Sequence, residues 1–282
     1  MVDGVGVAKR THRCLRENAG KKMKRRNLIA GLPFLATGVL GARIARAAPP
    51  LKVGAALPDP PFEFITGGSP AGFDISLMQQ IAVKLGREWR LAPYKGADFN
   101  GILAGLDTGA YDCIASGTTI TPGRQTIADF CPLYVVSGQS LVVDTTRHPN
   151  VHGIADLEGL VIGVQRGNTS QPVANKLVAE HRAARVRVYA YDEIEKALDD
   201  LSTGGCDAFM KLAPVTEWFV RDRPKLKVVE TGITREQLGI CVRKGDTALR
   251  DAIGRAQAAL TADGTLPALI RQWLGKAATV PG

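Results

Sequence analysis

The sequence predicts an α/β fold of two lobes, with mainly parallel sheets and two chain segments that cross between the lobes. From Leu51 onward, short apolar runs alternate with segments of helical period, as in chains whose helices connect parallel strands. This succession restarts at Gln139, which indicates a second lobe. No low-complexity linker separates the two successions, which favours lobes joined by strand-like crossings over independent domains.

The elements expected in the first lobe follow from these apolar runs. Strands are predicted at 51–57, 90–92 and 111–116, and helices at 74–85, 99–108 and 121–128. In the first helix, apolar residues recur at i, i+3 and i+4 from Leu77 to Leu85, and Gly86 ends it. Asp74 is placed to cap its N-terminus.

The second lobe and the C-terminal block show the same alternation. Strands are predicted at 139–143, 161–164, 186–189, 208–210 and 239–242, and helices at 154–157, 170–180, 193–201, 247–263 and 266–274. We therefore expect an export signal at 1–47, a first lobe formed by 48–133 and 241–282, a second lobe at 139–235, and a hinge at 134–138 and 236–240.

The net charge of +9 comes from the N-terminal segment. Eleven of the 36 Lys and Arg residues lie in residues 1–47, where only Asp3 and Glu17 oppose them. Residues 48–282 hold 25 bases and 25 acids. The basic surface expected of a nucleic-acid-binding protein is therefore absent from the sequence.

The N-terminal segment has the order of a secretory signal: the basic stretch Lys24-Arg25-Arg26, an apolar run over 28–40, and Ala45-Arg46-Ala47. The apolar run is shorter than the ~20 residues that span a bilayer. This favours cleavage near Ala47 and a periplasmic location. The paired arginines resemble a twin-arginine signal, the Sec route stays open, and Met23 is an alternative start.

Motifs in both lobes carry a family resemblance. They are Pro61-Phe62-Glu63-Phe64, Gly72-Phe73-Asp74-Ile75, the stretch 116–124, Asp129-Phe130, and then 156–159, 161–165, 205–208 and 242–246. Together they resemble the polar amino-acid-binding proteins of bacterial ABC importers, which are bacterial extracellular solute-binding proteins of family 3. The resemblance covers nearly all of 50–275. It implies the type II periplasmic-binding-protein fold, a monomer whose lobes close on a ligand, and the membrane permease of an ABC importer as partner.

The stretch 116–124 is the strongest candidate for binding a carboxylate. It follows a strand and leads into a helix, so backbone N–H groups, including that of Gly117, and the hydroxyls of Thr119 and Thr121 can face an anion. Arg124, one turn into the helix, adds a fork of donors suited to a carboxylate. The alternative is a solvated Arg124 that pairs with Asp129.

Three further residues are expected to contact the ligand. The resemblance implies that Phe99 lines the cleft with an aromatic wall, although packing in the core explains it too. Gln165 and Thr169 lie on a strand-to-helix turn of the second lobe and are expected to make the closing contacts. An ordinary helix cap explains Thr169 nearly as well.

Two positions depart from the family. Members that bind amino acids place an acid five positions after the aspartate matching Asp207, and here that residue is Leu212; another frequent acid falls near Ala56. An ammonium group would lose hydration there without gaining a carboxylate. We therefore expect an organic acid, with an amino acid as the close alternative. Asp59 could supply the acid, or Lys211 could favour an anion with two acidic ends; both could also be ordinary exposed residues.

Enzymatic activity is not expected. The same fold carries cyclohexadienyl dehydratases, whose general acid is a glutamate on the glycine-rich turn of the second lobe, and Gly167-Asn168-Thr169-Ser170-Gln171 contains none. His148 and His152 lie on a polar loop and the cysteines show no CxxC spacing, so neither a metal nor a cofactor is expected. A sensor or partner-binding role on the same fold is an alternative to transport.

Overall fold

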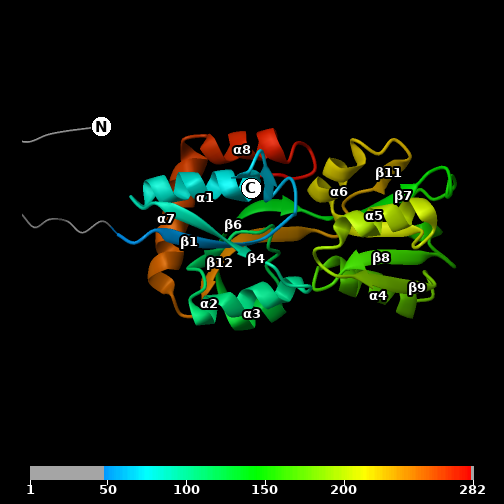
Figure 1. Ribbon diagram of the computed structural model, residues 1–282, viewed down its shortest axis with the longest axis horizontal. Coiled ribbons are helices and arrows are strands. Elements are labelled where there is room, and N and C mark those ends of the chain that lie inside the picture. Colours follow the sequence, from blue (N-terminus) through cyan, green and yellow to red (C-terminus); the bar gives the residue numbers. More distant parts are fainter. Residues whose placement is uncertain (1–47, 281–282) are drawn as a thin grey trace, which may run out of the picture. The chain divides into compact units, whose positions relative to one another are not determined.

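The computed structural model describes residues 48–280, which form two lobes, each built on one five-stranded sheet (Figure 1). The predicted α/β class with two lobes is confirmed. The export signal predicted at 1–47 lies outside the described residues.

The first sheet has the strand order β4-β1-β5-β12-β6. Its parallel part consists of β1 (Leu51–Ala56) between β4 (Trp89–Tyr94) and β5 (Cys113–Ile114). The long strands β12 (Glu236–Arg243) and β6 (Ala128–Ser137) extend it in antiparallel pairing. The residues of β1 are fully buried except Lys52, as expected for a central strand covered on both faces.

Helices cover both faces of the first sheet (Figure 1). On one face, α1 (Phe73–Lys84) packs against α7 (Thr247–Ala262) and α8 (Thr265–Trp273). On the other lie the 3-10 helix η1 (Phe99–Leu103) and α2 (Ala104–Thr108). These carry Phe99, Ile102, Leu103 and Leu106 into a core shared with Ala56 and Ile114. The short helix α3 (Pro122–Ile127) follows β5 on that side.

The second sheet has the order β11-β7-β10-β8-β9. Here β8 (Val161–Gln165) lies parallel to β9 (Arg185–Tyr189) and β10 (Ala208–Leu212), while β7 (Gln139–Asp144) runs antiparallel to β10 and to β11 (Leu226–Glu230). Its helical segments are η2 (Ile154–Asp156), α4 (Ser170–Ala179), α5 (Ile194–Thr203) and α6 (Ala213–Val220). The parallel strands of both lobes end in loops, and such carboxyl ends are where α/β folds place ligand sites.

The chain crosses between the lobes at or next to the segments predicted as the hinge, 134–138 and 236–240. β6 continues into β7 through Gly138, where a Cβ would lie 2.1 Å from the carbonyl oxygen of Thr234. Only glycine fits this approach of the two crossing segments. Most of 134–138 and 236–240 lies in the paired strands, with Glu236 opposite Ser137. The lobe boundaries and the hinge motion stay predictions.

Several elements escaped the sequence analysis. The hairpin of β2 (Phe64–Thr66) and β3 (Ser69–Ala71), the helix α6, and the strands β6 and β11 were not expected. β2 and β3 are only three residues long each and are joined by a turn of two glycines with positive φ. Strands this short do not show the alternation of apolar and polar residues that predicts a strand. β6 contains Pro132, which ordinarily argues against a strand.

The predicted cap of α1 was wrong. The capping residue is Gly72, whose φ of 123° suits glycine and whose Cβ would lie 2.3 Å from the carbonyl oxygen of Phe62. Asp74 lies in the first turn with its side chain fully buried, and it binds Gly117 as described below. Between residues 48 and 280, no helix is long and apolar enough to span a membrane.

The packing of α1 yields a stability test. Ile81 is fully buried in the main core, whereas Val83 on the same helix is 72% exposed. Ile81→Ala should lower the free energy of unfolding by about 2–5 kcal/mol, because it removes buried methyl groups and leaves a cavity. Val83→Ala, the matched control, should change it by less than about 0.5 kcal/mol. Urea unfolding measures both, and equal losses would contradict this packing.

Candidate functional site

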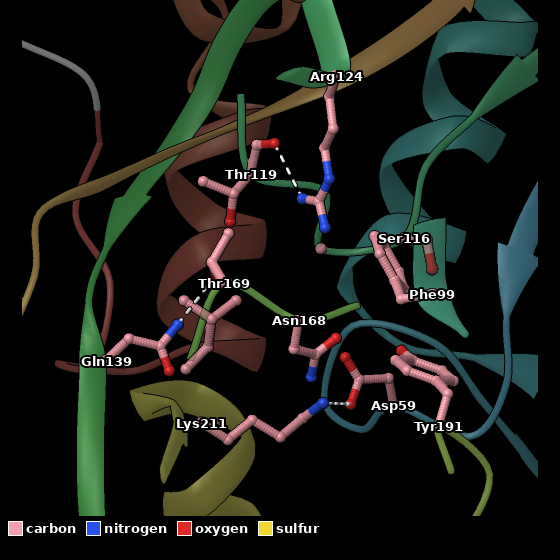
Figure 2. A pocket seen from close by; sticks show the side chains of 12 residues that line it. Asp59, Phe99, Ser116, Thr119, Arg124, Gln139, Asn168, Thr169, Tyr191 and Lys211 are labelled. Atoms are coloured by element: carbon pink, nitrogen blue, oxygen red, sulfur yellow. Dashed lines mark hydrogen bonds and ion pairs between the residues drawn. The ribbon is translucent and has the colours of Figure 1, made fainter. Parts of the chain in front are cut away.

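A cavity lies where the carboxyl ends of the parallel strands of the two lobes meet (Figure 2). The first lobe contributes Asp59, Phe99, Ser116, Gly117, Thr119 and Arg124 to its wall. The second contributes Gln139, Asn168, Thr169, Tyr191, Lys211 and Leu212. The cavity volume, about 20 Å³, is room for about one water molecule. The lobes are therefore closed on one another, and a larger ligand requires them to separate.

Arg124 is buried at one end of this cavity, with 6% of its surface exposed. Its guanidinium donates to Asn100 Oδ1 (3.1 Å), to the carbonyl of Thr119 (3.0 Å) and, across the lobes, to the carbonyl of Gly167 (3.1 Å). The guanidinium carbon, Cζ, lies 4.7 Å from the centre of the Phe99 ring. Burial lowers the pKa of Arg124.

No carboxylate of residues 48–280 forms an ion pair with Arg124. Asp129, the partner considered from the sequence, is paired with Lys244 instead, at 2.8 Å. The three acceptors that Arg124 does have are neutral amide oxygens. A buried cation of this kind is costly unless an anion completes its surroundings.

The loop before α3 was expected to offer its donors to an anion, but two of them face carboxylates of the protein. Gly117 N–H donates to Asp74 Oδ2 at 2.6 Å, and the Thr119 hydroxyl donates to Glu236 Oε2 at 2.6 Å. Thr121 is the helix cap, because its hydroxyl accepts from Arg124 N–H at 3.2 Å. Thr121 lies outside this cavity and lines the neighbouring groove.

Glu236, at the start of β12, ties the two lobes together beside the cavity. Its Oε2 accepts from Thr119 of the first lobe and from the hydroxyl of Thr169 of the second (2.7 Å). Its Oε1 accepts from Gln139 Nε2 (2.7 Å) and from the hydroxyl of Thr234 (2.9 Å). A hydroxyl has one proton. Thr119 and Thr169 therefore have only acceptor lone pairs left for a ligand, and one of those of Thr169 already accepts from Gln139 Nε2 at 3.1 Å.

The opposite end of the cavity holds a buried ion pair across the lobes (Figure 2). Lys211 Nζ lies 2.9 Å from Asp59 Oδ1, and the two side chains are 3% and 6% exposed. Lys211 also donates to Gln165 Oε1 at 2.6 Å and lies 5.2 Å from the centre of the Tyr191 ring. Asp59 Oδ1 accepts no well-aligned hydrogen bond within the described residues. Burial raises the pKa of Asp59, and the charge of Lys211 opposes this rise.

Two more acids are buried behind the loop of Gly117. The Glu63 carboxylate accepts from the Ser116 hydroxyl, and Asp74 Oδ2 accepts from Tyr134 at 3.2 Å as well as from Gly117. Burial raises the pKa of Asp74 to about 7. Burial and then the nearby Asp74 charge raise the pKa of Glu63 well above its ordinary value. These acids support the binding loop from behind and do not line the cavity.

Most residues predicted for the site come together. Arg124, Gly117, Thr119, Phe99, Thr169 and Asp59 line the cavity, whereas Gln165 and Thr121 do not. Gln165 is fully buried behind Lys211 and also donates to the carbonyl of Tyr191. Leu212 lines the cavity, and Ala56 is fully buried outside its wall. In residues 48–280, no cluster of three potential metal ligands occurs.

The sequence analysis missed Tyr191, Gln139 and Glu236. Tyr191 follows the carboxyl end of β9, a position that could have suggested a ligand site. Gln139 and Glu236 are adjacent to the crossing between the lobes. They reach the site only because that crossing passes beside it.

Comparison with known proteins agrees with this architecture. The model of bacterial extracellular solute-binding proteins, family 3, matches residues 51–276. The L-cystine-binding protein TcyJ of Escherichia coli K12 is 31% identical over 219 residues, which are 77% of this chain and 79% of that protein. The ABC transporter arginine-binding protein 1 of the same strain is 30% identical over 236 residues, 81% of this chain and 92% of that protein.

Solved structures show the same fold. An ancestral arginine-binding protein bound to arginine superposes with a TM-score of 0.74 at 32% identity, covering 82% of this chain and all of that one. The ancestral amino acid-binding protein AncCDT-1, a precursor of cyclohexadienyl dehydratase, gives a TM-score of 0.71 at 30% identity, covering 79% of this chain and 95% of that one. The type II fold implied by the sequence motifs is confirmed.

The buried Asp74 predicts a pH dependence of stability. The folded chain keeps its proton up to about pH 7, whereas the unfolded chain loses it near 3.8. In this interval the folded state binds more protons, so the contribution of Asp74 to stability falls as pH rises. Asp74→Asn removes this titration. The stability of the wild type relative to this variant should fall by up to about 1.4 kcal/mol per pH unit.

Urea unfolding of both proteins at several pH values in this interval measures the difference. The amide oxygen of the asparagine can still accept from Gly117 and Tyr134, so the variant is expected to fold. A constant difference between the two proteins would contradict the buried, protonated Asp74.

Proposed function

Because the chain belongs to family 3 of the bacterial extracellular solute-binding proteins, we propose that it is the binding component of an ABC importer and that its ligand is an amino acid. The observation that carries this proposal is the buried guanidinium of Arg124, which faces a cavity between the lobes and has only neutral acceptors. Closing the lobes on an amino acid would supply the missing anion.

In this proposal, the ligand carboxylate binds Arg124. The planar fork of a guanidinium matches the two oxygens of a carboxylate, and charge-assisted pairs of this kind are strong when desolvated. Arg124 already reaches Gly167 of the second lobe. A carboxylate held there would touch both lobes, and a ligand that contacts both lobes shifts their equilibrium toward closure.

The acceptors around the cavity favour an amino acid over an organic acid without an ammonium group. Leu212 and Ala56 stand where other family members have acids, but the buried carboxylate of Asp59 lines the cavity, and its Oδ1 has only the Lys211 ammonium nearby, at 2.9 Å and without good hydrogen-bond alignment. The hydroxyl lone pairs of Thr119 and Thr169 add two acceptors. These oxygens line the same cavity, and an ammonium group, which has three protons, binds acceptors of this kind. The organic acid expected from the sequence is therefore the less favoured ligand.

The aromatic side chains of Phe99 and Tyr191 provide the apolar part of the site. Their ring centres are 5.2 Å apart, and both line the cavity. They would pack against the carbon atoms of the ligand. The relatives compared are binding proteins, and we propose a non-enzymatic role that includes export with cleavage near Ala47 and delivery of the ligand to a membrane permease.

An aromatic cluster between the lobes offers a signal for ligand binding. Phe64 of the first lobe lies 5.0 Å from Trp218 of the second and 6.1 Å from Trp273 of the first, measured between ring centres. Opening and closing would change this environment. Tryptophan fluorescence of the chain beginning at Ala48 should therefore respond to a bound amino acid, and calorimetry gives the affinity independently.

Arg124→Ala should weaken the binding of the amino acid by about 2–5 kcal/mol, or roughly 30-fold to several thousand-fold in Kd, because one partner of a buried charge pair is lost. The fold should remain intact, as judged by thermal unfolding. Arg255→Ala, an exposed arginine of α7, is the matched control and should bind like the wild type. Unchanged affinity of the Arg124 variant would exclude this carboxylate site.

A further inference from the structure

Lys211 is a lysine held inside a ligand cavity, which needs an explanation. It belongs to β10, and every residue of this strand is buried. Lysines commonly keep their ammonium group in water, yet this side chain is 3% exposed. Gln165, Asp59 and the Tyr191 ring fix its ammonium group at the wall of the cavity. The outward-pointing lysine considered from the sequence is therefore wrong.

The cavity consequently has a cation at each end. Figure 2 shows Arg124 at one end and Lys211 with Asp59 at the other, with Asn168 between them. The charged residues that line the cavity are two cations, Arg124 and Lys211, and one acid, Asp59. Glu236 does not add a second acid to the wall, since hydroxyl and amide donors occupy both of its oxygens. This arrangement differs from a site with an acid at each end, which would suit a basic side chain.

Binding of an amino acid would change the balance at the Lys211 end. The Asp59 carboxylate is now paired with the Lys211 ammonium. If the ammonium group of the ligand also binds Asp59, one carboxylate must compensate two cations. The charged form of a buried lysine becomes less stable when the carboxylate that compensates it is shared with another cation. A second acidic group on the ligand would replace that partner, whereas a basic side chain would add a third cation.

Resting on the proposed function, we infer that Lys211 is a specificity-determining residue that selects an amino acid with a second acidic group and rejects basic ones. The α-carboxylate binds Arg124, and the side-chain carboxylate binds the ammonium group of Lys211. Gln165 positions Lys211 through its Oε1, 2.6 Å away. Rejection arises from repulsion between like charges in an enclosed site, which is an effective source of specificity.

The test compares three ligands of similar size: L-glutamate, L-glutamine and L-arginine. Calorimetric titrations use the chain beginning at Ala48 and its Lys211→Met variant, whose side chain has similar length but no charge. The wild type should bind glutamate at least about 10-fold more tightly than glutamine, and arginine least tightly, by the size of buried charge-pair effects. Lys211→Met should abolish this preference, weakening glutamate by about 30-fold and glutamine by less than about 3-fold.

Two further variants serve as controls. Lys211→Arg keeps the charge and should keep the preference for glutamate. Lys176→Met, at a lysine of α4 whose side chain is 75% exposed, should leave all three affinities unchanged. Thermal unfolding confirms that each variant is folded.

Several results would overturn the inference. Tighter binding of arginine than of glutamate by the wild type would contradict it. An equal loss of affinity for all three ligands in Lys211→Met would also contradict it, because the ion pair with Asp59 would then only hold the lobes together. In both cases amino acids still bind and the proposed function stands. If the folded wild type binds none of these ligands or any other amino acid, the proposed function fails together with the inference.

Discussion

The burial of Arg124 between the two lobes is the constraint on which the site depends. Its guanidinium has three neutral oxygen acceptors, one of them from the opposite lobe, and an aromatic ring beside it. These contacts fix the direction of its fork but do not neutralise its charge. The strand-loop-helix sequence that presents Arg124, supported from behind by Asp74 and Glu63, is thus arranged to receive an anion.

Closure of the lobes follows from polar contacts in the same region. Glu236 accepts from Thr119 and Thr169, which belong to different lobes, and Lys211 reaches Asp59 across the cavity. The crossing at Gly138 brings these groups together. The contacts of Glu236 with Thr119 and of Lys211 with Asp59 are buried, and that of Glu236 with Thr169 is part-buried. Separating the lobes returns these groups to water, whereas closing them without a ligand leaves the buried Arg124 without a carboxylate partner. A ligand that completes the pairing therefore favours the closed form.

Local sequence patterns predicted the parts of this site that a single loop provides. Gly117, Thr119 and Arg124 follow one strand and lead into one helix, so their proximity is determined within a few residues. The direction of Lys211 could not be predicted in this way, because β10 is buried on both faces and shows no alternation. Asp74 fits a helix cap from sequence alone, and only the tertiary approach of Gly117 reveals its role. Contacts such as Thr119 with Glu236 join residues 117 positions apart, where local patterns carry no information.

The central claim is that one amino acid bridges the lobes through Arg124. A crystal structure of the chain beginning at Ala48, grown with the amino acid that binds it most tightly, tests this most directly. The account predicts the α-carboxylate within hydrogen-bonding distance of the Arg124 guanidinium, the ammonium group near Asp59, and contacts from both lobes. A ligand bound to one lobe alone, or one that leaves Arg124 with only its protein acceptors, would contradict the account.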